Sequence, residues 1–208
     1  KVWRAMYHGW AVGYFSRGEH ASRHQLVNRC QFIHRNLPPQ LQVAMTATAD
    51  ELRFAAGGWI RGFPSTESAG ISYTMQLIVF DGLAYHAWGR QNVANVQPSL
   101  GAGGQFVAMS TADPHLGAFG YFKELWDRAV SGESGYKAVF WRGDLRPGRD
   151  AAWMAREKAA LGDDQAFNAF YPTTPAEAFI GKAGLVLPQF REDWHVIPNH
   201  PREWAECE

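Results

Sequence analysis

Alternating and continuous apolar segments predict several β-strands in the first half of the chain. Residues 10–15 are apolar apart from Gly13 and predict the first strand. Residues 51–55 and 59–63 are two further candidate strands, in which charged residues interrupt the apolar ones, and they flank the tripeptide Ala56-Gly57-Gly58. A short glycine-containing tract between two such segments is typical of a hairpin. We therefore expect one isolated strand followed by a two-stranded hairpin.

The clearest strand signal is the segment Met75–Asp81 (MQLIVFD). Consecutive apolar residues with β-branched members, closed by an aspartate, predict a strand that is buried on both faces. Gln105–Thr111 (QFVAMST) is a second segment of this kind and follows the glycine-rich tract 101–104. Ala138–Trp141 predicts a further short strand.

The segment after the first strand predicts a helix. Ser16 and Glu19 have the spacing of a capping box, and the helix should run to about Asn36. Pro38 and Pro39 would end it, because proline has no amide hydrogen to donate. One face of this helix carries residues spaced four, three and four apart: Leu26, Cys30, Ile33 and Leu37.

Three more helices are expected in the second half of the chain. They cover residues 119–130, 150–161 and 163–170, and Pro172 ends the last of them. Strands that alternate with helices favour a mostly parallel sheet with helices on both faces. The predicted fold class is therefore α/β, with three αβα layers.

Composition excludes several classes of protein. The 208 residues include 20 Lys or Arg and 20 Asp or Glu, so the formal net charge is zero, unlike that of a tail-type polyanion binder. A hydrophobic fraction of 46% argues against intrinsic disorder. No apolar window is long enough for a membrane span, so we expect a soluble protein without a membrane partner. Two distant cysteines, Cys30 and Cys207, favour a reducing intracellular setting.

Candidate chemistry lies at the ends of the two strongest strands. Ligands of parallel α/β sheets bind outside the carboxyl ends of the strands, where Asp81, Ser110 and Thr111 are expected. An aspartate at the tip of a buried strand is suited to holding Mg²⁺ beside phosphates. The alternative is structural, since a strand also ends in aspartate where the chain turns, and hydroxyls cap the helix that follows a strand.

The order of the motifs resembles the ATPase half of tailed-phage large terminase subunits. FPSTESAGISYTMQLIVFDGLAYHAW is similar to the Walker B region of that family, and QFVAMSTADPHLGAFGYFKELWDRA to the strand with its coupling motif. AVGYFSRGEHASRHQLVNRCQFIHRNLP resembles the strand and helix after the phosphate loop. FYPTTPAEAFIG and LPQFREDWHV resemble the tract that precedes the nuclease.

The resemblance implies a P-loop-NTPase-like core over residues 1–136 and a lid and linker over residues 137–208. It implies ATP with Mg²⁺ as cofactors, with Asp81 as the Walker B aspartate that holds Mg²⁺ through water. Ser110 and Thr111 take the place of the coupling motif. The implied partners are double-stranded DNA, the portal protein, a small terminase subunit and further copies of the chain, in the cytoplasm of a bacterial host.

The departures from the family pattern concern catalysis. No G-x-x-x-x-G-K-[ST] occurs, so the phosphate loop is expected before Lys1 and the nuclease after Glu208. Gly82 stands in the place of the catalytic glutamate, and a glycine cannot polarise the attacking water. Gly70-Ile71-Ser72 stands in the place of the transition-state arginine. These departures predict a chain that is inactive or incomplete as an ATPase.

A second hypothesis is that the chain has this fold without catalytic activity. The chain would then be a non-catalytic DNA- or capsid-binding protein built on a degenerate NTPase fold. Arg17, Arg23 and Arg29 lie in one short stretch around the first full helix and are candidates for phosphate contacts. The alternative for these arginines is an ordinary solvated helix face.

Overall fold

One six-stranded sheet organises the protein in the computed structural model, which describes residues 1–180 apart from the side chains of residues 23–25. The strand order is β2-β3-β4-β1-β5-β6. Strands β4, β1, β5 and β6 are parallel, and β2 and β3 continue the sheet antiparallel. The bounds are β1 Ala11–Ser16, β2 Met45–Ala47, β3 Glu51–Phe54, β4 Trp59–Pro64, β5 Met75–Asp81 and β6 Leu100–Met109.

Seven α-helices and several shorter helical turns connect and cover these strands in residues 1–180. The α-helices are α1 Val2–His8, α2 Asn28–Arg35, α3 Gly89–Val96, α4 Tyr121–Val130, α5 Ala151–Leu161, α6 Asp164–Phe170 and α7 Pro175–Ala178. A π-helical segment, η1 Ala21–Val27, leads into α2. The 3₁₀ turns are η2 Pro39–Leu41, η3 Leu83–Tyr85, η4 Gln97–Ser99, η5 Gly117–Phe119 and η6 Gly143–Leu145.

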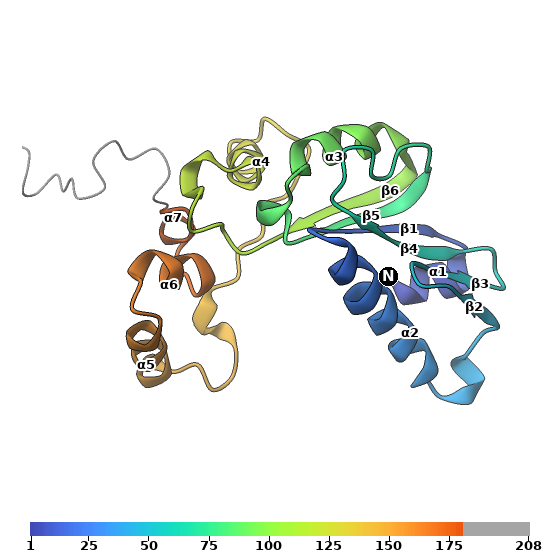
Figure 1. Ribbon diagram of the computed structural model, residues 1–208, viewed down its shortest axis with the longest axis horizontal. Helices are drawn as coiled ribbons and strands as arrows, with labels where there is room; N and C mark the ends of the chain where they lie inside the picture. The colour runs from blue at the N-terminus through green and yellow to red at the C-terminus, as the bar shows by residue number, and fades with distance from the viewer. Residues whose placement is uncertain (181–208) are drawn as a thin grey trace, which may run out of the picture.

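The predicted three-layer α/β class is confirmed. Because successive strand residues point to opposite faces, Tyr14 of β1 and Val79 of β5 pack with α1, η1 and α2. Phe15 and Phe80 point the other way and pack with α3 and α4. Figure 1 shows α1 and α2 on one side of the sheet and α3 on the other. We call these sides the α2 face and the α3 face.

The first predicted helix starts later than its sequence pattern suggested. Ser16 is buried as the last residue of β1, and helical backbone begins only at Glu19 and continues into η1 at Ala21 without a side-chain cap, so the predicted capping box does not form. The predicted apolar stripe is also partly wrong. Ile33 is half exposed, whereas His34 is buried and its Nε2 donates to the Val43 carbonyl at 2.9 Å.

The predicted strand at Ala138–Trp141 does not form in the described structure. These residues belong to no helix and to no ladder of the sheet. A strand needs a hydrogen-bonded neighbour, and β6, the last strand of the described sheet, does not pair with this segment. β6 itself is longer at its start than predicted, because Gly101–Gly104 joins it, and it ends at Met109 before Ser110.

The later helices begin where capping residues predicted. Asp163 accepts hydrogen bonds from the amides of Gln165 and Ala166 at the start of α6. Thr174 and Glu177 form a full capping box at α7, so Glu177 stabilises the start of this helix. α5 packs against α6, and α6 against α7. No helix within residues 1–180 combines the length and apolar composition that crossing a bilayer requires.

The aromatic stack in the α3-face core should dominate stability. Phe15 is fully buried and stacks on Phe63 and Phe80, with ring centroids 4.8 and 4.5 Å away. Phe15→Ala should lower the free energy of unfolding by about 3–5 kcal/mol, measured by urea denaturation. Phe119, which is 71% exposed, is the control, and Phe119→Ala should change it by less than about 0.5 kcal/mol. Equal effects would contradict this assignment of the core.

Candidate functional site at the carboxyl ends of the parallel strands

The parallel strands end at one level of the sheet. Ser16 of β1 is in register with Asp81 of β5, and Asp81 with Met109 of β6. Ser110 follows Met109 directly, so the structure brings Asp81 and Ser110 to adjacent strand ends, as the sequence predicted. Asp81 is partly exposed and, in the described part of the chain, forms no ion pair.

Ser110 joins the loop after β5 to the end of β6. Its Oγ accepts a hydrogen bond from the Ala84 amide at 3.2 Å. The Gly82 amide donates to the Met109 carbonyl at 2.8 Å, earlier along the same loop. Any displacement of the β5 loop must therefore move or break contacts with the end of β6. Ser110 has a structural function that its position in the sequence did not reveal.

Thr111 is held through the same loop by Tyr85. The Tyr85 hydroxyl donates to the Ala112 carbonyl at 2.7 Å and lies 3.1 Å from Thr111 Oγ1. Burial raises the pKa of Tyr85, and the hydrogen bond with Thr111 opposes the shift. The positive charge of Arg17 also opposes this rise of the pKa.

The three candidate arginines therefore have different positions. Arg17 is exposed directly after β1, at the same edge of the sheet as Asp81. Arg29 is exposed on α2 and lies beside Lys1 and Tyr14. Arg23 belongs to η1, and its side chain lies outside the described residues. Of the three, Arg17 is the one near the strand ends.

The charge of Asp81 acts on two buried neighbours. Burial raises the pKa of Tyr14 to about 12, and the negative charge of Asp81 adds to that shift. Burial also lowers the pKa of His86, although its Nε2 donates to the Asp81 carbonyl at 3.0 Å. Sequence reasoning did not assign functions to His86 or Tyr85, although both lie in the quoted AYHAW motif. They fix the loop that follows Asp81.

Gly82 has a backbone conformation that glycine favours. Its φ is 70° and its ψ is 37°. This is the left-handed region, in which an L-residue with a side chain has a higher free energy than glycine. A Cβ would have space there, since the nearest atom is Tyr85 Cδ2 at 4.0 Å. The obstacle to a side chain at position 82 is therefore the backbone and not crowding.

The described strand ends supply one protein ligand for a Mg²⁺ ion whose other ligands come from a nucleotide and water. Mg²⁺ at such sites takes one or two carboxylates and completes its shell with phosphate oxygens and water. Asp81 supplies one partly exposed carboxylate. In residues 1–180 no three His, Cys, Asp or Glu side chains gather into a metal site. Asp81 alone is therefore no site for a free metal ion.

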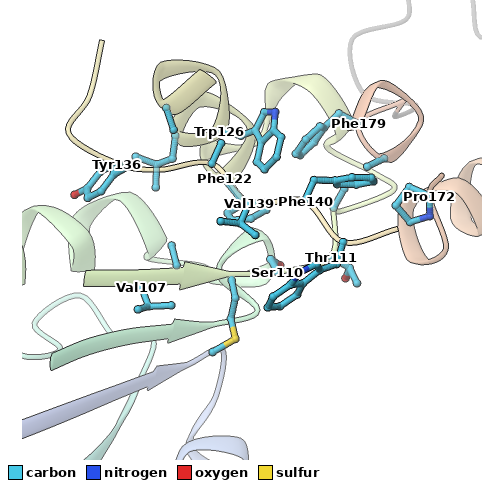
Figure 2. A pocket seen from close by; sticks show the side chains of 18 of the residues that line it. Val107, Ser110, Thr111, Phe122, Trp126, Tyr136, Val139, Phe140, Pro172 and Phe179 are labelled. Carbon is cyan, nitrogen blue, oxygen red and sulfur yellow. The ribbon is translucent and has the colours of Figure 1, made fainter. Parts of the chain in front are cut away.

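An apolar cavity of about 540 Å³ opens beside Ser110 and Thr111 (Figure 2). Its lining comes from β6, from α4, from residues 136–141 and from the region of α6 and α7. Trp126 of α4 and Phe179, which follows α7, lie 6.2 Å apart between ring centroids on one side of it. The sequence pattern did not predict this cavity.

Phage large terminases are among the solved structures that are similar to this chain. The large terminase of a thermophilic bacteriophage, in complex with ADP, matches with a TM-score of 0.61 and 15% identity. The match covers 93% of this chain and 46% of that one. The HK97 bacteriophage large terminase matches with a TM-score of 0.58 and 11% identity, over 81% and 39%. No family model matches the sequence, and no curated protein matches significantly.

The chain has the fold of phage large terminases. A second crystal form of the thermophilic phage protein agrees, with a TM-score of 0.59 over 94% of this chain. The chain spans about half the length of these terminases. The expected terminase-like fold is thereby confirmed. The tract LPQFREDWHV, also quoted for the resemblance, lies outside the described residues.

A side chain at position 82 should lower the free energy of unfolding. Gly82→Ala should lower the free energy of unfolding by about 1–2 kcal/mol, because alanine is disfavoured in the left-handed region. Gly18→Ala is the matched control and should cause no loss, since Gly18 has no left-handed φ and an added Cβ would have no atom within 4 Å. Urea denaturation of both variants measures the difference. Equal stability of the two would show that Gly82 is not conformationally required.

Proposed function

We propose that this chain is the ATPase-type domain of a viral DNA-packaging motor. The observation that supports it most directly is the convergence of Asp81, Ser110 and Arg17 at the strand ends of a sheet with the terminase fold. At this edge of the sheet, the carboxylate matches a Mg²⁺ ion and the cation matches the phosphates of a nucleoside triphosphate, while the hydroxyl holds the loop between them. One of the matched terminases was solved with ADP.

The residues have separate functions in this proposal. Asp81 would hold a Mg²⁺ ion through water, and the ion would supply positive charge that neutralises the phosphates. Ser110 holds the loop after β5 against β6, so that Asp81 keeps its position. Thr111, through Tyr85, links this loop to the segment that leads toward α4. A shift at the strand ends would thus reach the later part of the chain.

We do not propose that residues 1–208 hydrolyse ATP by themselves. Gly82 supplies no carboxylate to activate water, and its left-handed backbone disfavours any side chain there. Residues 1–136 are the ATPase-like core, and residues 137–208 are the lid and linker. The helices α6 and α7 contact the first part through one small apolar cluster, which consists of Ala112, Ala169, Ala178 and Phe179, with Phe122 and Trp126.

The proposed setting follows from the same likeness. The partners are double-stranded DNA, the portal protein, a small terminase subunit and other copies of the chain, and the location is the cytoplasm of a bacterial host. A zero net charge means that DNA would be bound locally and not by the whole surface.

Nucleotide binding and hydrolysis can be separated in one titration. With ATP and Mg²⁺, calorimetry measures binding and a coupled assay measures phosphate release. We expect release no faster than without protein. Asp81→Asn should weaken Mg²⁺-dependent binding by about 10-fold or more, because a ligand of the hydrated ion is lost. Asp127→Asn on α4 is the control and should bind as the parent does.

Two results would contradict this proposal. Phosphate release well above background, and abolished in Asp81→Asn, would show that Gly82 does not prevent hydrolysis. Complete absence of ATP binding, in a chain that denaturation shows to be folded, would favour the second hypothesis.

The second hypothesis is a non-catalytic DNA- or capsid-binding protein on the same fold. Gly82 favours it, and so does Ile71 in the place of the family's arginine, because Ile71 carries no charge and is half exposed. Its DNA-binding form requires phosphate contacts from the arginines around η1 and α2. The exposure of Arg29 is compatible with that.

The salt dependence of DNA binding tests these contacts. Each phosphate contact adds about 0.9 to the magnitude of the slope of log K against log salt. Arg23→Ala with Arg29→Ala should therefore reduce that magnitude by about 2, measured by fluorescence anisotropy on duplex DNA. Arg146→Ala with Arg156→Ala, both exposed and distant in sequence, is the control double variant. An unchanged slope would exclude the helix as a DNA contact.

A further inference from the structure

Two histidines of the described chain make the same kind of buried contact with the backbone. His34 is 6% exposed and His86 is 8% exposed. The Nε2 of His34 donates to the Val43 carbonyl at 2.9 Å, and the Nε2 of His86 donates to the Asp81 carbonyl at 3.0 Å. In both cases a side chain supplies the hydrogen-bond donor for a main-chain carbonyl.

The carbonyl contact determines which ring nitrogen carries the hydrogen. A carbonyl oxygen only accepts hydrogen bonds, so Nε2 is protonated in both rings and Nδ1 is the bare nitrogen of the neutral ring. Both Nδ1 atoms are buried without a hydrogen-bond partner among the described residues. Each ring also lies near a phenylalanine ring, His34 at 5.8 Å from Phe54 and His86 at 5.7 Å from Phe80 between centroids. Each histidine is therefore held as one tautomer in apolar surroundings.

The two histidines differ in the carbonyl that they hold. Val43 lies in the segment between η2 and β2. Asp81 is the last residue of β5, and its register partner Ser16 is the last residue of β1. The ladder between these strands therefore ends at Asp81, and the donor for its carbonyl comes from His86.

The loop after β5 returns His86 to the end of the strand. The amide of Tyr85 donates to the Gly82 carbonyl at 2.9 Å, and that of His86 to the Leu83 carbonyl at 3.2 Å. Leu83 is 2% exposed and anchors this turn in the core. Helix α3 then begins at Gly89, whose amide donates to the His86 carbonyl at 3.2 Å. The backbone of His86 is thus fixed on both sides of its ring.

The peptide between Asp81 and Gly82 is held at both of its polar groups. Its carbonyl accepts from His86, and its amide, which belongs to Gly82, donates to the Met109 carbonyl at 2.8 Å. A rotation of this peptide plane would break both hydrogen bonds. It would also change the φ of Gly82, which is 70°. The orientation of the main chain at Asp81 therefore depends on a side chain five residues later.

The His86 ring and the Asp81 carboxylate lie on opposite sides of the sheet. Successive side chains of a strand point to opposite faces, and Val79 belongs to the core of the α2 face whereas Phe80 belongs to that of the α3 face. Asp81 therefore points to the α2 face, while the His86 ring lies beside Phe80. His86 thus acts on Asp81 through the backbone and not on a ligand of its carboxylate.

We propose that His86 is a positioning residue for Asp81. Its ring holds the Asp81–Gly82 peptide in one orientation, and this orientation directs the Asp81 carboxylate to the α2 face at the strand end. The inference rests on the proposed function, in which Asp81 holds Mg²⁺ beside a nucleotide. Residues that orient a metal ligand without touching the metal typically change the metal affinity by about 10–100-fold.

Calorimetric titration of ATP at a series of Mg²⁺ concentrations tests the proposal. His86→Phe keeps a ring beside Phe80 and removes the donor. It should weaken the apparent Mg²⁺ affinity by about 10-fold and change ATP binding without Mg²⁺ by less than about 2-fold. His86→Gln retains an N–H donor and should restore the Mg²⁺ affinity to within about 3-fold of that of the parent chain.

His34→Phe is the matched control, because it removes the same kind of hydrogen bond in another part of the chain. Both phenylalanine variants should lower the Tm, since each leaves a carbonyl without its donor. Only His86→Phe should change the Mg²⁺ affinity. An equal loss of Mg²⁺ affinity in both variants would overturn the proposal, and so would an unchanged Mg²⁺ affinity in folded His86→Phe.

Two NMR measurements on the protein without nucleotide test the same assignment. Long-range proton–nitrogen spectra under mildly alkaline conditions should show the Nε2–H tautomer for His86, and the Nδ1–H tautomer would overturn the proposal. The Gly82 amide should exchange about 10-fold faster in His86→Phe than in the parent chain or in His34→Phe, because the carbonyl of its peptide has lost its donor. Unchanged exchange in His86→Phe would contradict the proposal.

These measurements separate the positioning of Asp81 from nucleotide binding. A parent chain that binds no ATP would contradict the proposed function, whereas the His86 tautomer and the exchange of Gly82 would still decide whether His86 holds the peptide. If His86→Phe does not fold, His86→Gln decides the question of Mg²⁺ affinity. A folded His86→Gln that loses as much Mg²⁺ affinity as Asp81→Asn would overturn the proposal.

Discussion

Parallel pairing of β1 with β5 is the constraint on which the rest of the structure depends. Both strands are covered on both faces, so each contributes side chains to two cores at once. Their register fixes Ser16 opposite Asp81, and the register of β5 with β6 fixes Asp81 opposite Met109. The level at which the candidate site lies is therefore set by hydrogen bonds in the interior of the sheet.

Much of the fold could be predicted because burial on both faces leaves a strong signal in sequence. Met75–Asp81 was predicted with its observed bounds, since a continuous apolar run ending in aspartate has few alternative structures. The helix starts at Asp150 and Asp163 were equally clear, because a capping carboxylate is a local interaction. These features depend on neighbours within a few residues.

The remaining features depend on contacts that a local pattern does not contain. Ala138–Trp141 has the composition of a strand, but pairing requires a partner, which the described sheet does not supply. Ser16 matched a capping box in sequence, but in the sheet it is the last residue of β1. The candidate site was predicted at Asp81 and Ser110, whereas the positions of Arg17 and Tyr85 depend on tertiary structure.

The left-handed backbone at Gly82 bears on how this site could be converted into a hydrolytic one. A carboxylate introduced at position 82 would add a group that can activate water. The same substitution would place a side chain on a left-handed backbone, which is unfavourable, so the two effects would oppose each other. Relief of that cost requires a different path for the turn Leu83–Tyr85, which is held in place by the contact of Ala84 with Ser110 and, directly after the turn, by the contact of His86 with Asp81. Catalytic competence at this position is therefore a property of the whole loop, and a gain of function would need coordinated changes along it.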